Sequence, residues 1–207
     1  MRTLLFFICL ILGYLLGSIP FALVIGKVFY KKDIRNYGSG NLGGTNAGRI
    51  LGPKAGVAVI LCDILKVVLA TAIATTVSAE TAIWTGLACC IGHCYPIFAN
   101  FKGGKAVSTV FGFLLGTTIF VFHRASFFIV PALMFLIVLY LFKYVSLASI
   151  CATLCSSLFI SACFWQFNFQ NICIIFASWM MTILVIYRHH SNIDKIKKGT
   201  ENSISWM

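Results

Sequence analysis

The chain has 207 residues, of which 60% are hydrophobic and only 10% are charged. Soluble domains carry roughly 25% charged residues, so this composition excludes a water-soluble fold. Lysine and arginine outnumber acidic residues by 16 to 5, which gives a formal net charge of +11. Nucleic-acid binding is not expected, because no soluble domain is left to present that charge.

Apolar windows of about 20 residues, long enough to cross a hydrocarbon core, recur along the chain. The first follows Arg2 and continues to Ile25 without a small-x-small cleavage site, which predicts a retained span and not a cleaved signal peptide. The pattern predicts an all-α, polytopic membrane protein whose single domain covers residues 1–207. Its seven predicted transmembrane helices are residues 4–28, 55–77, 82–98, 106–122, 127–142, 145–164 and 172–187.

The basic residues predict the orientation of these helices, because cytoplasmic loops carry an excess of Lys and Arg. With the N-terminus outside and the C-terminus in the cytoplasm, thirteen basic residues fall on the inner side. Only Arg2 and Arg124 fall outside, and Lys66 lies within the second helix. An even number of spans would place the basic C-terminal tail and the glycine-rich loops on opposite sides of the membrane, and the basic residues would no longer gather on one side. We therefore expect a membrane protein with a basic cytoplasmic face.

The first inner loop, residues 33–49, interleaves glycines with hydroxyl and amide side chains. Glycines let successive backbone N–H groups face one point, and this arrangement binds anions. Arg49 adds a planar cation. A flexible surface turn is the alternative, but it would not need this density of donors. The predicted phosphate-binding residues are Gly38, Ser39, Gly40, Asn41, Thr45, Asn46 and Arg49.

The second inner loop contains Lys102, Gly103, Gly104 and Lys105 just before the fourth predicted helix. Free backbone donors, a helix N-terminus and a lysine together favour phosphate binding. The loop is not a Walker A motif, since the hydroxyl residue after the lysine is missing, so ATP is not implied. Further polar residues at the same face are Ser146, Ser149, Arg188, His189, His190 and Asn192.

Several residues within the helices have two interpretations. Asp63 and Lys66 stand three apart and are expected to form a structural ion pair, although ionisable residues in membranes are often functional. His93 either orients the loop after Pro96 or touches substrate. The spacings Gly13/Gly17 and Gly112/Gly116 predict close helix packing. The nine cysteines lie mostly in apolar windows without zinc-type spacing, and no metal site is expected.

Six motifs are spread along almost the whole length of the sequence. They are Gly17-Ser-Ile-Pro20, Gly38-Ser-Gly-Asn-Leu-Gly-Gly-Thr-Asn46 with Arg49, Gly92-His93 with Pro96, Phe101-Lys-Gly-Gly-Lys105, Arg188-His-His-Ser-Asn-Ile193 and Gly199-Thr-Glu201. In these motifs the sequence resembles the bacterial acyl-phosphate:glycerol-3-phosphate acyltransferases, the PlsY family. It departs from the usual family pattern at Leu42, Gly44 and Ala106, where proline, alanine and glycine are more common.

The resemblance implies transfer of a fatty acyl group from acyl phosphate to the 1-hydroxyl of glycerol 3-phosphate, giving lysophosphatidic acid and phosphate. It implies seven helices, a cytoplasmic active site, and no acyl-CoA, metal or other cofactor. Expected partners are the two substrates, membrane lipid and, transiently, the enzyme that makes acyl phosphate. Glu201 maps onto a structural family glutamate. The implied catalytic residues are Ser39, Arg49, Lys105, His189 and Asn192.

Two other functions remain open on the residues alone. A transporter of a phosphorylated metabolite could use the same loops as a vestibule, but the outer loops are short and paired broken helices are not apparent. A scaffold that holds anionic lipid would not need two glycine-rich loops. We expect the acyltransferase function.

Overall fold

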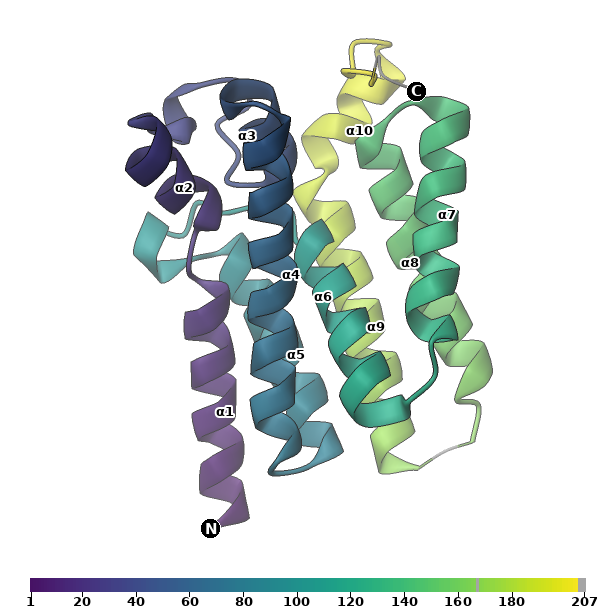
Figure 1. The fold of residues 1–207 in the computed structure, drawn as a ribbon. Coiled ribbons are helices and arrows are strands. Elements are labelled where there is room, and N and C mark those ends of the chain that lie inside the picture. The colour runs from purple at the N-terminus through teal and green to yellow at the C-terminus, as the bar shows by residue number, and fades with distance from the viewer. Residues whose placement is uncertain (167, 205–207) are drawn as a thin grey trace.

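The protein, seen in a computed structural model that describes residues 1–166 and 168–204, is a bundle of helices, and this part of the chain contains no strand. The two termini lie at opposite ends of the bundle (Figure 1). The helices are α1 (Arg2–Gly17), α2 (Phe21–Tyr30), η1 (Ile34–Asn36), α3 (Gly44–Leu51), α4 (Pro53–Thr75), α5 (Ala79–Cys94), η2 (Ile97–Ala99), α6 (Val107–Thr117), η3 (Thr118–Phe122), α7 (Ser126–Phe142), α8 (Val145–Cys163), α9 (Phe169–Arg188) and α10 (His190–Lys197).

Helices α4, α8 and α9 and the segment Ala79–Ala99 are long and apolar enough to cross a membrane. The bent pair of α1 and α2 makes a fifth candidate, and Val107–Phe122 and Ser126–Phe142 are shorter apolar helices. The last six predicted helices therefore correspond to α4 through α9, with ends that differ by a few residues. The count of seven crossings stays a prediction.

The first predicted helix, residues 4–28, is wrong as a continuous element. It breaks between α1 and α2, whose axes differ by 41°. Pro20 explains the break, because proline has no N–H and pushes the preceding residue away from helical geometry. The carbonyl of Ile19, at the break, accepts a hydrogen bond from Lys66 Nζ at 3.0 Å.

Helices α3 and α10 were not predicted. Helix α3 forms inside the segment that was expected to be an irregular glycine-rich loop. It packs on α4 where both helices have small residues, and a Cβ placed on Gly56 would lie 2.7 Å from the Cα of Gly48. Glycine is used here for close approach between helices, which sequence composition alone does not distinguish from flexibility.

The predicted glycine contacts between helices are confirmed. A Cβ on Gly17 of α1 would overlap the carbonyl oxygen of Cys89 on α5. A Cβ on Gly112 of α6 would lie 2.6 Å from the carbonyl oxygen of Ile64 on α4. These contacts join α1, α4, α5 and α6 into a tight group, whereas α7 packs chiefly on α8.

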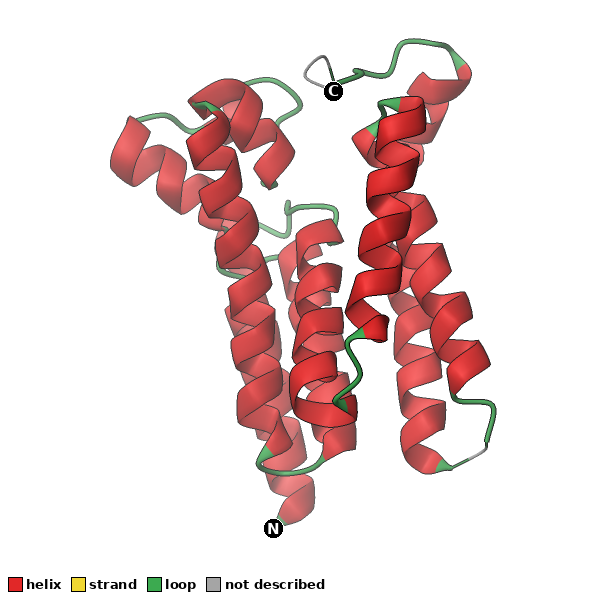
Figure 2. Cartoon of the chain, turned by 45° about the vertical axis from the view of Figure 1, so that its right-hand side comes forward, coloured by secondary structure: helices red, strands yellow, loops and turns green. Residues whose placement is uncertain are grey.

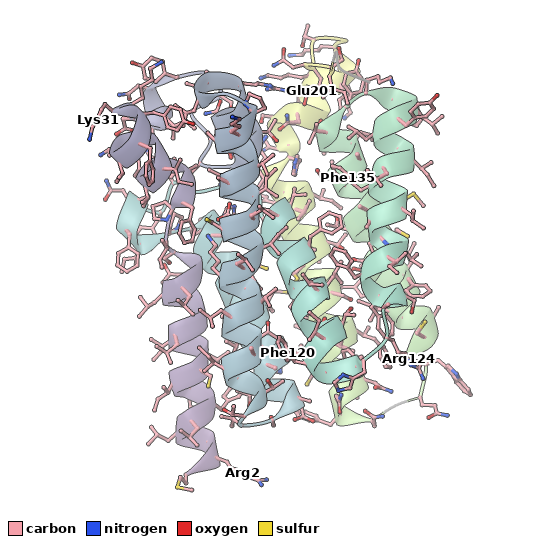
Figure 3. The ribbon with its side chains drawn as sticks, in the orientation of Figure 1. Arg2, Lys31, Phe120, Arg124, Phe135 and Glu201 are labelled. Carbon is pink, nitrogen blue, oxygen red and sulfur yellow. The ribbon has the colours of Figure 1, made fainter. Side chains whose placement is uncertain are left out.

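Charged side chains are divided between the two ends of the bundle. Arg2 and Arg124 lie at one end, and Lys31 and Glu201 lie at the other (Figure 3). The second end also carries α2, α3, α10 and the loops around them (Figures 1 and 2). We call it the basic end, because Lys27, Lys31, Lys32 and the lysines of α10 are there.

Candidate active site

A cavity of about 910 Å³ opens toward the basic end. One part of its wall is polar and is formed by the segment before α3, by α3 itself, by Lys105 and by α10. The other part is apolar and is formed by α4, α6 and α7, for example by Ile60, Phe111 and Phe135. The cavity therefore joins a surface suited to anions with a surface suited to a hydrocarbon chain.

The structure brings all five predicted catalytic residues to this cavity. Four predicted substrate-binding residues, Gly40, Lys102, Gly103 and Gly104, are not in its wall. The predicted residues that do line the cavity are Ser39, Arg49, Lys105, His189, Asn192, Gly38, Asn41, Thr45, Asn46, Ser146 and Ser149.

The N-terminus of α3 faces the cavity through Gly44 and Thr45. The first N–H groups of a helix have no acceptor within the helix and attract anions. Arg49 follows Thr45 by one turn, so both side chains lie on the same side of α3, and Arg49 also lines the cavity. Helix α3 thus presents backbone donors and one guanidinium to the same space.

Asn46 lines the cavity and also holds the loop before α3 together. Its Oδ1 accepts from the backbone N–H of Ser39 at 3.0 Å, and its Nδ2 donates to the carbonyls of Tyr37 and Asn41, each at 3.2 Å. Both hydrogens of the amide are therefore used within the loop. Asn46 is 3% exposed and fixes the loop that carries Ser39, while its direct role in substrate binding stays a prediction.

The prediction of free donors at Gly103 and Gly104 is wrong. Their N–H groups donate to the carbonyls of Cys94 and His93, at 3.2 and 3.0 Å. Their own carbonyls accept from Arg188, through Nη2 at 2.9 Å and Nε at 3.0 Å. The two glycines anchor the segment before Lys105 against α5 and α9, and so they position the lysine.

Lys105 belongs to a chain of hydrogen bonds that connects three parts of the sequence. Its Nζ donates to Asn192 Oδ1, and Asn192 Nδ2 donates to Glu201 Oε1 at 2.7 Å. Ser146 Oγ donates to the same Glu201 oxygen at 2.7 Å. Burial lowers the pKa of Lys105 below its usual value, and the nearby Glu201 carboxylate opposes this effect.

His189 is 3% exposed, and its Nδ1 lies 2.8 Å from the carbonyl oxygen of Val185. A carbonyl only accepts, so Nδ1 carries the proton and Nε2 keeps its lone pair. Burial lowers the pKa of His189 to about 4, and the charges of Lys105 and Arg188 act in the same direction. The imidazole is therefore neutral at neutral pH.

Some residues in the cavity wall were not assigned a role from the sequence. From the sequence, Arg188 was predicted only to be a polar residue at the cytoplasmic face. Its hydrogen bonds to the Gly103 and Gly104 carbonyls show that it holds the segment before Lys105 in place. Ser108 and Lys195 also line the cavity and were missed. Ile60, Phe111, Ala132 and Phe135 gave no signal, because helices that are apolar on all sides do not show which face lines a cavity.

Within residues 1–166 and 168–204, no three His, Cys, Asp or Glu side chains are arranged to hold a metal ion. The fold and the cavity define a helical membrane protein with a cavity whose polar wall suits an anion and whose apolar wall suits a hydrocarbon chain. Residues 7–199 match the family model described as glycerol-3-phosphate acyltransferase. The chain belongs to this family of integral membrane acyltransferases.

Similar proteins agree with this assignment over nearly the whole chain. The glycerol-3-phosphate acyltransferase of Enterococcus faecalis is 44% identical, covering 96% of this chain and 92% of its own length. Glycerol-3-phosphate acyltransferase 2 of Bacillus anthracis is 45% identical, with coverages of 94% and 97%. The crystal structure of PlsY (YgiH) in its glycerol 3-phosphate form has a TM-score of 0.87 and 36% identity, covering 97% of this chain and 96% of that one. Its lysophosphatidic acid form has a TM-score of 0.84 and 35% identity, with coverages of 97% and 95%.

Proposed function

We propose that the protein transfers a fatty acyl group from acyl phosphate to the 1-hydroxyl of glycerol 3-phosphate, giving lysophosphatidic acid and inorganic phosphate. The observation that carries this proposal is the continuity of the polar and apolar walls of one cavity. Both substrates carry phosphate, and the donor also carries a hydrocarbon tail. Among the residues that the structure describes, no comparable feature favours the transport of a phosphorylated metabolite.

In this proposal, phosphate groups lie among Ser39, Arg49, Lys105 and the first N–H groups of α3. The acyl tail lies against Ile60, Phe111 and Phe135. Phe111 contacts Phe135 edge to face, with ring centroids 5.8 Å apart, so this wall is well packed. Ile60 of α4 and Leu136 of α7 line the cavity and are 40% and 51% exposed, which supports entry of the acyl tail from the side, between these two helices.

The glycerol 1-hydroxyl oxygen attacks the acyl carbonyl carbon and forms the new ester bond. The bond from that carbon to the phosphate oxygen breaks, and phosphate leaves with the electron pair. Lys105, Arg49 and the α3 amides stabilise the negative charge on the departing phosphate and the carbonyl oxygen. A mixed anhydride needs no further activation of the acyl group.

The proton of the hydroxyl goes either to an oxygen of the acyl phosphate or to His189 Nε2. His189 has the required free lone pair. However, a pKa of about 4 makes it a weak base, which favours the phosphate oxygen as the acceptor. A His189→Gln variant separates the two, since the rate would stay close to that of the parent if the phosphate takes the proton.

We further propose that the chain crosses a bacterial inner membrane seven times, with the N-terminus outside and the basic end in the cytoplasm. The excess of Lys and Arg at the basic end supports this orientation. Glycerol 3-phosphate then enters from the cytoplasm. Acyl phosphate enters from the lipid or by transient contact with the enzyme that makes it. Residues 1–207 act as a single domain.

The test is the formation of lysophosphatidic acid by detergent-purified protein given glycerol 3-phosphate and either palmitoyl phosphate or palmitoyl-CoA. Lys105→Ala is the matched control. We expect product from the acyl phosphate alone and its loss in the variant. Product from palmitoyl-CoA only would disprove the proposed donor while leaving the family activity intact.

A further inference from the structure

Asp63, Lys66 and His93 form a buried polar cluster beside the cavity, which we call the buried triad. Lys66 Nζ lies 2.8 Å from Asp63 Oδ1 and 3.1 Å from His93 Nδ1. The three residues are 1%, 4% and 5% exposed. The predicted Asp63–Lys66 ion pair is thus present, but it includes a histidine that the reaction described above does not use.

The contacts of the buried triad determine which nitrogen of His93 carries the proton. An ammonium group has only donors, so Nδ1 accepts from Lys66. Asp63 Oδ1 is farther from Nδ1, at 3.4 Å, and is already paired with the ammonium. The proton therefore lies on Nε2, and His93 is a neutral imidazole with a donor on the side away from Lys66.

The position of Gly104 shows what lies beside that donor. A Cβ on Gly104 would overlap His93 Nε2, so this glycine leaves room for the imidazole next to the backbone of the Lys105 segment. His93 lines the same cavity as Lys105. In the described part of the chain, hydrogen bonds of the ring involve Nδ1, and no protein acceptor is paired with Nε2.

A purely structural role explains only part of the buried triad. Lys66 does stabilise the break between α1 and α2 through the Ile19 carbonyl. For this role Lys66 needs only Asp63, which balances its charge, and the Ile19 carbonyl; the contact with His93 is not required. The remaining N–H of His93 belongs to a residue that lines the cavity and has no protein acceptor in the described part of the chain, so a bound substrate can supply the acceptor.

We propose that His93 is a further catalytic residue, which donates Nε2–H to an anionic oxygen of the phosphate-bearing substrate beside Lys105. Asp63 and Lys66 are positioning residues that fix its tautomer and orientation. This inference rests on the proposed placement of phosphate at Lys105. It gives His93 the role of a donor that stabilises negative charge, and excludes it as a base.

Two amide variants distinguish the role of the Nε2–H donor of His93 from that of the contact between its Nδ1 and Lys66. Asn reaches about as far as Nδ1, so His93→Asn keeps an acceptor for Lys66 and removes the donor in the cavity. Gln reaches about as far as Nε2, so His93→Gln keeps that donor and gives up the contact with Lys66. His123→Gln, an exposed change at the opposite end, is the control for histidine replacement.

Rates are measured with whichever acyl donor the parent chain uses, so a failure of the donor assignment remains a separate result. Loss of one donor to developing charge costs roughly 10²-fold or more in kcat. We expect His93→Asn to lose kcat on this scale and to melt like the parent. We expect His93→Gln to keep at least tenfold more activity than His93→Asn. Activity of His93→Asn equal to or above that of His93→Gln would overturn the proposal.

A second readout does not depend on activity. In protein labelled with ¹⁵N-histidine, the signal lost in His93→Asn identifies His93. We expect a protonated Nε2 and an unprotonated Nδ1 at neutral pH, and a change of this pattern in Lys66→Met, which removes the donor to Nδ1. A proton on Nδ1 in the parent protein would contradict the proposed role.

Discussion

Asn192 and Glu201 lie 2.7 Å apart, with the amide Nδ2 donating to the carboxylate. The opposite side of the same amide accepts from Lys105, so the orientation of Asn192 is fixed from both sides. Ser146 donates to the same Glu201 oxygen. The residues after α10 therefore control where the ammonium of Lys105 stands, although Glu201 is far from it in the sequence.

Asn192→Asp is the sharpest change to this arrangement. It replaces the Nδ2 donor with a carboxylate oxygen that faces the Glu201 carboxylate. The other oxygen of the aspartate can still accept the hydrogen bond from Lys105. Breaking a hydrogen bond to a charged group costs roughly 1.5–3 kcal/mol, so we expect at least a tenfold loss of kcat/KM and a lower melting temperature. Acyl transfer and thermal unfolding in detergent measure both. Asn171→Asp, at the opposite end of the bundle, should change neither, and equal effects of the two variants would contradict this explanation.

His189 gives the stability of the protein a pH dependence of definite sign. Its pKa is about 4 in the folded protein and 6.5 without the fold, so the unfolded chain binds more protons between these values. The free energy of unfolding should therefore fall as the pH drops from about 6.5 to about 4, by an amount on the order of 3 kcal/mol at most. Melting temperatures at about pH 5 and pH 7.5 should differ less in His189→Gln than in the parent. An unchanged difference would show that the side chain is not buried as described.

Ala132 of α7 offers a test of where the acyl tail lies, because it lines the apolar part of the cavity between Phe128 and Phe135. Ala132→Phe fills that space, so long chains should lose burial. Each methylene left unburied costs about 0.8 kcal/mol, or roughly fourfold in kcat/KM. We expect the ratio of kcat/KM for palmitoyl over lauroyl phosphate to fall. Leu133→Phe, on the exposed face of α7, should leave the ratio unchanged.

Gly17 and Gly48 should respond in opposite ways to alanine. A Cβ on Gly17 meets the backbone of Cys89, which cannot move aside, whereas a Cβ on Gly48 has its nearest neighbour at 3.6 Å. Overpacking costs roughly 1–3 kcal/mol, so Gly17→Ala should melt at a clearly lower temperature. Gly48→Ala should be neutral or slightly stabilising, because alanine favours helix. Similar melting of both variants would show that α1 and α5 are less closely packed.

The sequence predicted what depends on hydropathy and missed what depends on contacts. Six of the helices were found because long apolar runs differ sharply from their flanking residues. The break at Pro20 was missed because the residues around it are apolar as well. Helix α3 was missed because its glycines serve the contact with α4, and in the sequence they look the same as glycines of a flexible loop.

The predicted site shows the same division. Ser39, Arg49 and Lys105 could be proposed from their loops because their chemistry suits phosphate, whereas the catalytic set that adds His189 and Asn192 was implied by the family resemblance. All five residues reach one cavity. The hydrogen bonds of Asn46, and the use of the Gly103 and Gly104 amides by α5, depend on which backbone groups come near them. The course of the loop before α3 decides the contacts of Asn46, and the packing of α5 and α9 decides those of the two glycines; neither leaves a local pattern in the sequence.

In the proposed orientation, the exposed side chains of Ile60 and Leu136 bring the cavity into contact with lipid, while its polar wall at the basic end faces water. A headgroup can be exchanged with water at the basic end while a chain enters sideways from the hydrocarbon. The amphiphilic donor would then be concentrated by partitioning before it meets the protein, and its supply would follow its mole fraction in the leaflet and not its aqueous concentration. The lipid product could return to the same leaflet without passing through water.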